Sequence, residues 1–248
     1  RRTLLNETPS GSRAVTVFHL LWVLICYRTN KKRAGRAGDH PAMRGDPSGT
    51  EEIRLTALTD NMTFGTFMAP FHRVGENPTL ALERDLELIE WMDDLGFDEA
   101  WVGEHHSGGW ETIASPEVFI ATAAGRTRHI RFGTGVVSLP YHHPLMVANR
   151  MVQLDHMSRG RILFGVGPGA LPGDAYMMGI PHEKQRERMD ESLSIIMRLF
   201  NETEPITYKS DWFELNEGML QLRPYQQPHM PIAVASIQTP SGVALAGK

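Results

Sequence analysis

From residue 62 onward the sequence predicts an α/β fold: a (β/α)8 barrel of which about the first five strand–helix units are present. Short apolar runs alternate with amphipathic helical stretches, which is typical of a parallel sheet. These units follow one another at barrel spacing until the sequence stops. A five-stranded open sheet is the competing architecture. Its dinucleotide-binding form is disfavoured, because the first strand carries no G-x-G-x-x-G pattern.

The first two units precede residue 130. We expect a strand over 63–69 and a helix over 78–95, which Gly96 ends. The apolar face of this helix is formed by residues at helical spacing: Leu82, Leu86, Ile89 and Met92. The second strand covers 99–103. The segment Ser115-Pro116-Glu117 then predicts the next helix, with proline in its first turn.

The later units follow the same order. The expected elements are a glycine-punctuated strand over 130–139, a helix over 144–160, a strand over 161–166, a long loop to about 182 and a charged helix to 200. A β-hairpin insertion is expected near 205–225. A fifth strand over 231–235 and a helix start at Pro240 complete the pattern.

Size and composition set the class of protein. The chain has 248 residues, of which 41% are hydrophobic and 22% charged, enough for a single-domain core. The single cysteine, Cys26, excludes an internal disulfide framework and a cysteine-based zinc site, so we expect a cytoplasmic protein. Residues 62–248 hold 15 Lys and Arg against 23 Asp and Glu. This net negative charge does not favour the phosphate backbone of a nucleic acid, so we expect no nucleic-acid partner.

The first 61 residues differ from the rest. They carry ten Lys and Arg against six Asp and Glu, and they show no strand–helix periodicity. The apolar run over 15–27 is shorter than the roughly 20 residues that a spanning helix needs, so we expect no stable membrane insertion. We therefore expect an unrelated or disordered extension over 1–61 and a barrel domain over 62–248. Because the sequence opens on Arg1, we interpret it as a fragment.

Titratable side chains follow the second strand. Its apolar residues lead directly into Glu104-His105-His106. In a barrel the carboxyl ends of the strands form the face that does chemistry. Histidine can give or take a proton near neutral pH, so this segment predicts an acid/base site.

Four segments together indicate a family. Glu104-His105-His106 is followed by 133–137 (Gly-Thr-Gly-Val-Val), by His143-Pro144 and by 154–161, all in one order. This pattern resembles the bacterial luciferase-like flavin monooxygenases over about 62–248. The loop at 167–174 is most similar to the limonene-monooxygenase branch.

The resemblance implies a luciferase-like TIM barrel that binds reduced FMN (FMNH2) at the carboxyl ends of its strands. Oxygen adds to the reduced flavin and an organic substrate is then oxygenated. The implied substrate is small and apolar, such as the monoterpene limonene. The implied partners are a separate NAD(P)H:flavin reductase and a second subunit, in a homo- or heterodimer.

The resemblance also assigns roles to residues. His105 matches the histidine beside the flavin that assists proton transfer, and His106 is expected to support it. Gly135-Val136 matches a non-prolyl cis peptide under the flavin ring. Asp174 matches a loop aspartate close to the flavin. A phosphate-binding turn is matched by four residues: Ser236, Ile237, Gln238 and Ser241.

One departure from the family pattern concerns the end of the fourth strand. Light-emitting relatives carry a reactive cysteine and a basic residue there, whereas this chain has Gly167 and Pro168. The difference argues against luminescence and removes one phosphate contact.

Two alternatives remain open on sequence. A metal-dependent barrel hydrolase could use Glu104 and nearby histidines, but adjacent histidines on a strand diverge and no chelating H-x-H pair occurs among them. We therefore expect no metal. The other alternative is a non-catalytic flavin-binding subunit.

Overall fold

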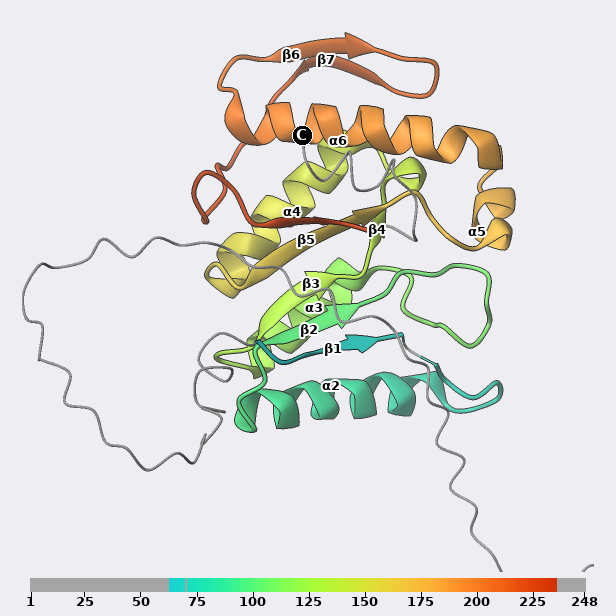
Figure 1. The fold of residues 1–248 in the computed structure, drawn as a ribbon, viewed down its shortest axis with the longest axis vertical. Helices are drawn as coiled ribbons and strands as arrows, with labels where there is room; N and C mark the ends of the chain where they lie inside the picture. The colour runs from blue at the N-terminus through green and yellow to red at the C-terminus, as the bar shows by residue number, and fades with distance from the viewer. Residues whose placement is uncertain (1–62, 70, 236–248) are drawn as a thin grey trace, which may run out of the picture. The chain divides into compact units, whose positions relative to one another are not determined.

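The computed structural model describes residues 63–69 and 71–235. Its main sheet is parallel, with the strand order β1-β2-β3-β5 and with β8 paired to β5 (Figure 1). The strands are β1 (Gly65–Met68), β2 (Glu99–Val102), β3 (Arg131–Thr134), β5 (Ile162–Gly167) and β8 (Ile232–Val234). This sequential parallel order is that of a partial barrel and confirms the predicted fold class. The division into an extension over 1–61 and a domain over 62–248 stays a prediction.

The expected continuous strand over 130–139 is wrong. β3 ends at Thr134, the short strand β4 (Val137–Ser138) pairs with β5, and the 3-10 helix η1 (Leu139–Tyr141) follows. The interruption has a local cause, because the Thr134 hydroxyl takes over backbone partners of β5. It donates to Gly165 O at 2.7 Å and accepts from Gly165 N at 2.9 Å. The peptide bond between Gly135 and Val136 is cis, at the position that the sequence predicts.

Helices cover one face of the sheet as a row in which each packs on the next (Figure 1). They are α2 (Pro78–Asp94), α3 (Pro116–Arg126), α4 (Pro144–Ser158) and α6 (Gln185–Asn201). The first three begin with proline, which suits the first turn of a helix. Asn77 caps α2 by accepting from the backbone N–H groups of Thr79 and Leu80. Within the described part of the chain, no helix is both long and apolar enough to cross a membrane.

The segment over 167–182 is not the plain loop that the sequence predicts. It contains the short helix α5 (Pro172–Met177), and the 3-10 helix η2 (His182–Lys184) precedes α6. Propensity alone does not hold a six-residue helix in water. α5 is tied to the sheet edge by the buried side chain of Asp174, which receives hydrogen bonds from His106 N and Ser107 Oγ.

The core lies between the sheet and the helices. Alternate strand residues on the helix side are fully buried, as Val102, Phe132 and Phe164 illustrate. The opposite face of the sheet is poor in side chains at β3 and β5, where Gly133 and Gly165 occupy paired strands. A Cβ at Gly133 would meet the Trp101 ring, so that ring fills the space above it.

A hairpin of β6 (Ile206–Lys209) and β7 (Glu214–Gly218) is present where the sequence predicts an insertion. It lies against α6 (Figure 1). Glu191 of α6 accepts hydrogen bonds from the Tyr208 hydroxyl at 2.8 Å and from Trp212 Nε1. The hairpin is therefore fixed to the helix by partly buried polar contacts.

Candidate active site

Glu104 is the buried centre of the site. β2 ends at Val102 and places Glu104 just past the strand end, 4% exposed. Its Oε1 accepts hydrogen bonds from His106 Nε2 and His142 Nε2, each at 2.8 Å. Its Oε2 accepts from Ser138 N at 2.9 Å. One carboxylate therefore joins the segment after β2 to the end of β4.

Hydrogen bonding controls the charge of Glu104. Burial by itself would raise the pKa of this carboxyl, but the donors of His106, His142 and Ser138 outweigh burial and lower the pKa to about 2. The same contact with Glu104 raises the pKa of His106. His142 Nδ1 faces the Arg150 guanidinium at 3.4 Å, and because arginine only donates, the proton of His142 is on Nε2.

His105 has a different pair of partners. Its Nδ1 lies 3.3 Å from Asp174 Oδ2 and its Nε2 lies 3.1 Å from Glu111 Oε2. The side chain of His105 is 23% exposed, whereas that of Asp174 is 2% exposed. Asp174 Oδ1 also accepts from His106 N at 3.1 Å and from Ser107 Oγ at 2.6 Å. A reactant that reaches this face therefore meets the ring of His105 in front of a buried carboxylate.

The two histidines diverge for a reason other than strand alternation. Strand alternation would require β2 to continue through His106, but β2 ends at Val102. Side-chain partners set the two directions instead: Asp174 and Glu111 hold His105, and Glu104 holds His106. The structure thus brings the adjacent residues His105 and His106 together with Asp174, which lies nearly 70 residues further along the sequence.

The cis peptide lies beside these residues. Gly135 N donates to Val102 O at 2.6 Å, which places the peptide next to the end of β2. Gly135 and Val136 are partly exposed, whereas Thr134 and Val137 on either side are buried. A Cβ at Gly103 would lie 3.5 Å from Gly135 O. A Cβ at Gly135 would lie 2.6 Å from the Phe67 ring, so that ring and the Gly135-Val136 peptide together form a surface that a flat ring system fits.

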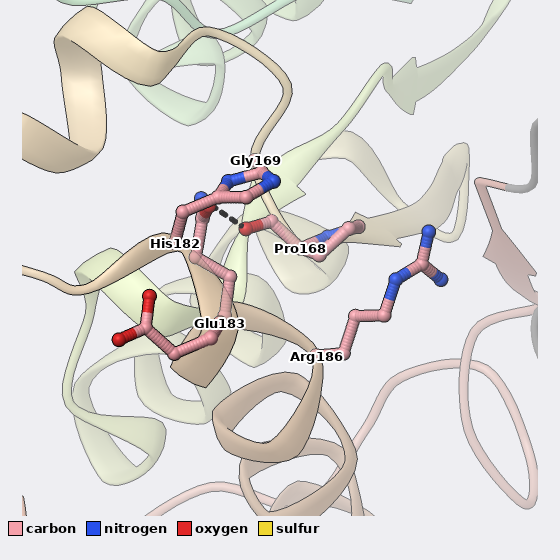
Figure 2. A pocket seen from close by; sticks show the side chains of 6 residues that line it. Pro168, Gly169, His182, Glu183 and Arg186 are labelled. Carbon is pink, nitrogen blue, oxygen red and sulfur yellow. Dashed lines mark hydrogen bonds between the residues drawn. The ribbon is translucent and has the colours of Figure 1, made fainter.

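A pocket of about 210 Å³ lies past the end of β5 (Figure 2). It is lined by Pro168, Gly169, His182, Glu183, Gln185 and Arg186. Gln185 Nε2 donates to Pro168 O at 2.9 Å and closes one wall. The side chains of Glu183 and Arg186 extend in opposite directions in Figure 2. The pocket thus combines a glycine-rich turn, the first turn of α6 and an arginine.

Tyr141 connects this pocket to the histidine cluster. Its hydroxyl accepts from Gln185 Nε2 at 3.0 Å, and its ring packs edge-on to the ring of His106. Burial, with the negative charges of Asp174 and Glu104, raises the pKa of Tyr141 to about 12. Tyr141 is therefore a neutral hydroxyl at neutral pH.

Several of the residues that the sequence singles out either lie outside the described residues or face away from the cluster. Ser236, Ile237, Gln238, Ser241 and the helix start at Pro240 lie outside the described residues. His143, which matches a family position, does not face the cluster. Its ring packs on Phe213 and its Nε2 lies 3.3 Å from Glu214 O in the hairpin.

Sequence reasoning missed Glu111 and Arg186. Glu111 stands in a glycine-rich loop, where an acid is usually solvated. One feature of the sequence could have indicated the position of Glu111. The loop connects β2 to α3, so its residues must pass the sheet edge near His105. Arg186 belongs to the charged helix that the sequence does predict, and only its position in the first turn marks it as facing the pocket.

The donors that a metal-dependent hydrolase needs are not assembled in the described segments. Within 63–69 and 71–235, no three His, Cys, Asp or Glu side chains are arranged to hold a metal ion. Each imidazole of the cluster instead faces a carboxylate, as His106 and His142 do at Glu104.

Comparison with known proteins gives consistent matches. The family described as luciferase-like monooxygenase matches residues 62–248. The chain is 56% identical over 189 residues to 4-hydroxyprotoasukamycin monooxygenase of Streptomyces nodosus subsp. asukaensis, covering 76% of this chain and 51% of that protein. It is 51% identical over 194 residues to limonene 1,2-monooxygenase of Rhodococcus erythropolis, covering 77% and 49%. The chain therefore spans about half the length of these curated relatives.

A solved structure shows the same fold. The oxygenating constituent of 3,6-diketocamphane monooxygenase from Pseudomonas putida, solved in complex with FMN, matches with a TM-score of 0.66 and 28% identity. The match covers 73% of this chain and 53% of that one.

Proposed function

The chain belongs to the luciferase-like monooxygenase family, and on that premise we propose that it is the oxygenase of a flavin-dependent monooxygenase that uses reduced FMN and O2. The observation that carries the proposal is the partly exposed His105 ring, held by Asp174 near the cis peptide bond between Gly135 and Val136. FMN is favoured because a family structure was solved with it.

The site residues fit a flavin. The partly exposed Gly135-Val136 peptide would lie against the flavin ring, and the Phe67 ring beside Gly135 would form part of the same surface. When bound, reduced FMN would supply the electrons that activate O2, of which one atom enters the substrate and the other leaves as water. His105 would move a proton at its ring nitrogens, while Asp174 fixes the ring orientation.

Arg186 is the proposed phosphate partner. Pro168 stands where some relatives carry a basic residue, and Arg186 lines the same pocket from the first turn of α6. A guanidinium is suited to a phosphate, because its positive charge and its several N–H donors both favour an anion. The predicted turn at Ser236–Ser241 would act with it.

The substrate is proposed to be small and apolar, with limonene as the first choice because of the 51% identical relative. The proposal also includes a separate NAD(P)H:flavin reductase, since a family structure is described as an oxygenating constituent. We also propose that the protein forms a homo- or heterodimer and that it is cytoplasmic, as expected from the sequence.

To test the proposal, the full-length protein is incubated with FMN, a flavin reductase, NADH and limonene under ¹⁸O2. We expect a limonene product that carries one ¹⁸O atom, measured by mass spectrometry. Absence of any oxygenated product from limonene, camphor-type diketones and related small apolar compounds would contradict the proposal.

Two controls sharpen this test. Binding of reduced FMN and of a deazaflavin is titrated in parallel, and tighter binding of the deazaflavin would overturn the choice of FMN.

The Arg186→Gln variant should weaken the binding of FMN about tenfold or more while leaving riboflavin binding unchanged, because riboflavin lacks the phosphate. Equal loss for both ligands would contradict the role of Arg186.

A further inference from the structure

Glu111 is a second carboxylate on His105 that the proposed function does not use. Its side chain is 9% exposed, and its Oε2 lies 3.1 Å from His105 Nε2. Asp174 occupies the opposite side of the ring at Nδ1. Each nitrogen of the His105 ring therefore faces a carboxylate of its own.

The loop that carries Glu111 is fixed in place. Glu111 forms an antiparallel bridge with Phe71, and His72 N donates to Trp110 O at 2.6 Å. The buried ring of His72 bonds the Thr112 hydroxyl at 2.5 Å through Nδ1 and donates to Asp85 Oδ2 at 2.7 Å through Nε2. Residues on both sides of Glu111 are thus anchored, and the contact with His105 follows from the loop geometry.

The Glu111 side chain is less exposed than the His105 ring that it contacts. The flanking Trp110 and Thr112 are exposed, whereas the Glu111 side chain is turned inward. The charged groups that face Glu111 are His105 and Asp174. Burial raises the pKa of Glu111, the positive charge of His105 opposes this, and Asp174 adds to it.

We propose that Glu111 is the proton-exchange partner of His105, holding Nε2 and accepting and returning the proton of that nitrogen. In the step, the Nε2–H bond of the imidazolium breaks and an O–H bond forms on Glu111, which leaves a neutral ring and a carboxylic acid. The reverse step reloads His105. Glu111 acts through His105, so it is a positioning residue. The inference rests on the proposed function but can be tested without cofactor.

The first experiment measures the carboxyl carbon of Glu111 by ¹³C NMR in the cofactor-free full chain, assigned by its loss in Glu111→Gln. We expect Glu111 to titrate above pH 4.5 in the wild type. In His105→Asn the midpoint should rise further, by about one pH unit, because a nearby positive charge is lost. His143→Asn is the matched control and should leave the midpoint unchanged. A midpoint that His105→Asn does not move would overturn the proposal.

The second experiment uses turnover with reduced FMN. Glu111→Gln keeps the side-chain size but cannot accept a proton, so turnover should fall about tenfold to a hundredfold. The fall of turnover at low pH, which the wild type should show, should be absent from the pH profile of this variant. Glu111→Asp should restore part of the rate, and the exposed Glu87→Gln should behave as wild type. Wild-type pH dependence in Glu111→Gln would overturn the proposal. If the wild type does not oxygenate at all, the proposed function fails, and the NMR coupling still decides on Glu111.

Discussion

His105 and His106 are adjacent in sequence but are held by different partners. The ring of His106 donates to the buried Glu104 and packs on Tyr141. The ring of His105 lies between Asp174 and Glu111, which come from a helix and a loop, and it reaches the surface. The identity of a titratable residue therefore says little about its role until its partners are known.

The difference has a physical basis. Glu104 receives three donors, two of them from imidazoles, and so it forms a closed network between strand ends. Closed buried networks make a unique arrangement rigid. The His105 ring faces an acceptor on each side and is partly exposed, so it can exchange a proton with a visiting group. The comparison predicts that damage at Glu104 reduces stability and damage at His105 reduces turnover.

The largest expected effect on stability is that of Glu104→Gln. The amide nitrogen of the glutamine would place a donor where Glu104 has an acceptor oxygen. Because the groups around that position are also donors, buried donors would be left unpaired. We expect a loss of about 3–5 kcal/mol in the free energy of unfolding, measured by urea denaturation of the full chain. The exposed Glu87→Gln should change it by less than about 0.5 kcal/mol. A loss below about 1 kcal/mol at Glu104 would mean that the network does not hold the strand ends.

The pH dependence of stability tests the same network. Since the folded pKa of Glu104 is about 2, below the ordinary 4.5, its contribution is present above pH 4.5 and is lost as the pH falls toward 2. The folded pKa of His106 is raised above 6.5, so its contribution is full below pH 6.5 and is lost as the pH rises through the folded pKa. Both slopes should flatten in Glu104→Gln, measured by urea midpoints from pH 2 to 9. Parallel curves for the two proteins would contradict this.

A smaller effect is expected at Ser107, on the His105 side. Ser107→Ala removes the 2.6 Å hydrogen bond to Asp174, which keeps its bonds from His106 N and His105. We expect a loss of about 1 kcal/mol in thermal unfolding experiments. A loss as large as that of Glu104→Gln would remove the distinction between the two environments.

Periodicity was enough to predict the parallel order of strands and helices, because apolar spacing reports burial directly. It did not predict the break after Thr134, since that depends on a side chain bonding the neighbouring strand. α5 was missed because tertiary contacts of Asp174 stabilise it. Within the site, family resemblance pointed to His105 and Asp174. Glu111 was not assigned, because only the folded loop brings it to His105.

The most direct test compares His105→Asn with His106→Asn in the full-length protein, measuring FMNH2-dependent oxygenation and the free energy of unfolding for each. We predict that His105→Asn lowers turnover by about 10²–10⁴-fold with stability within about 1 kcal/mol of wild type. His106→Asn should instead show its main loss in stability. Wild-type turnover in His105→Asn, or the same pattern of losses in both variants, would contradict the assignment of His105 as the proton-transfer residue.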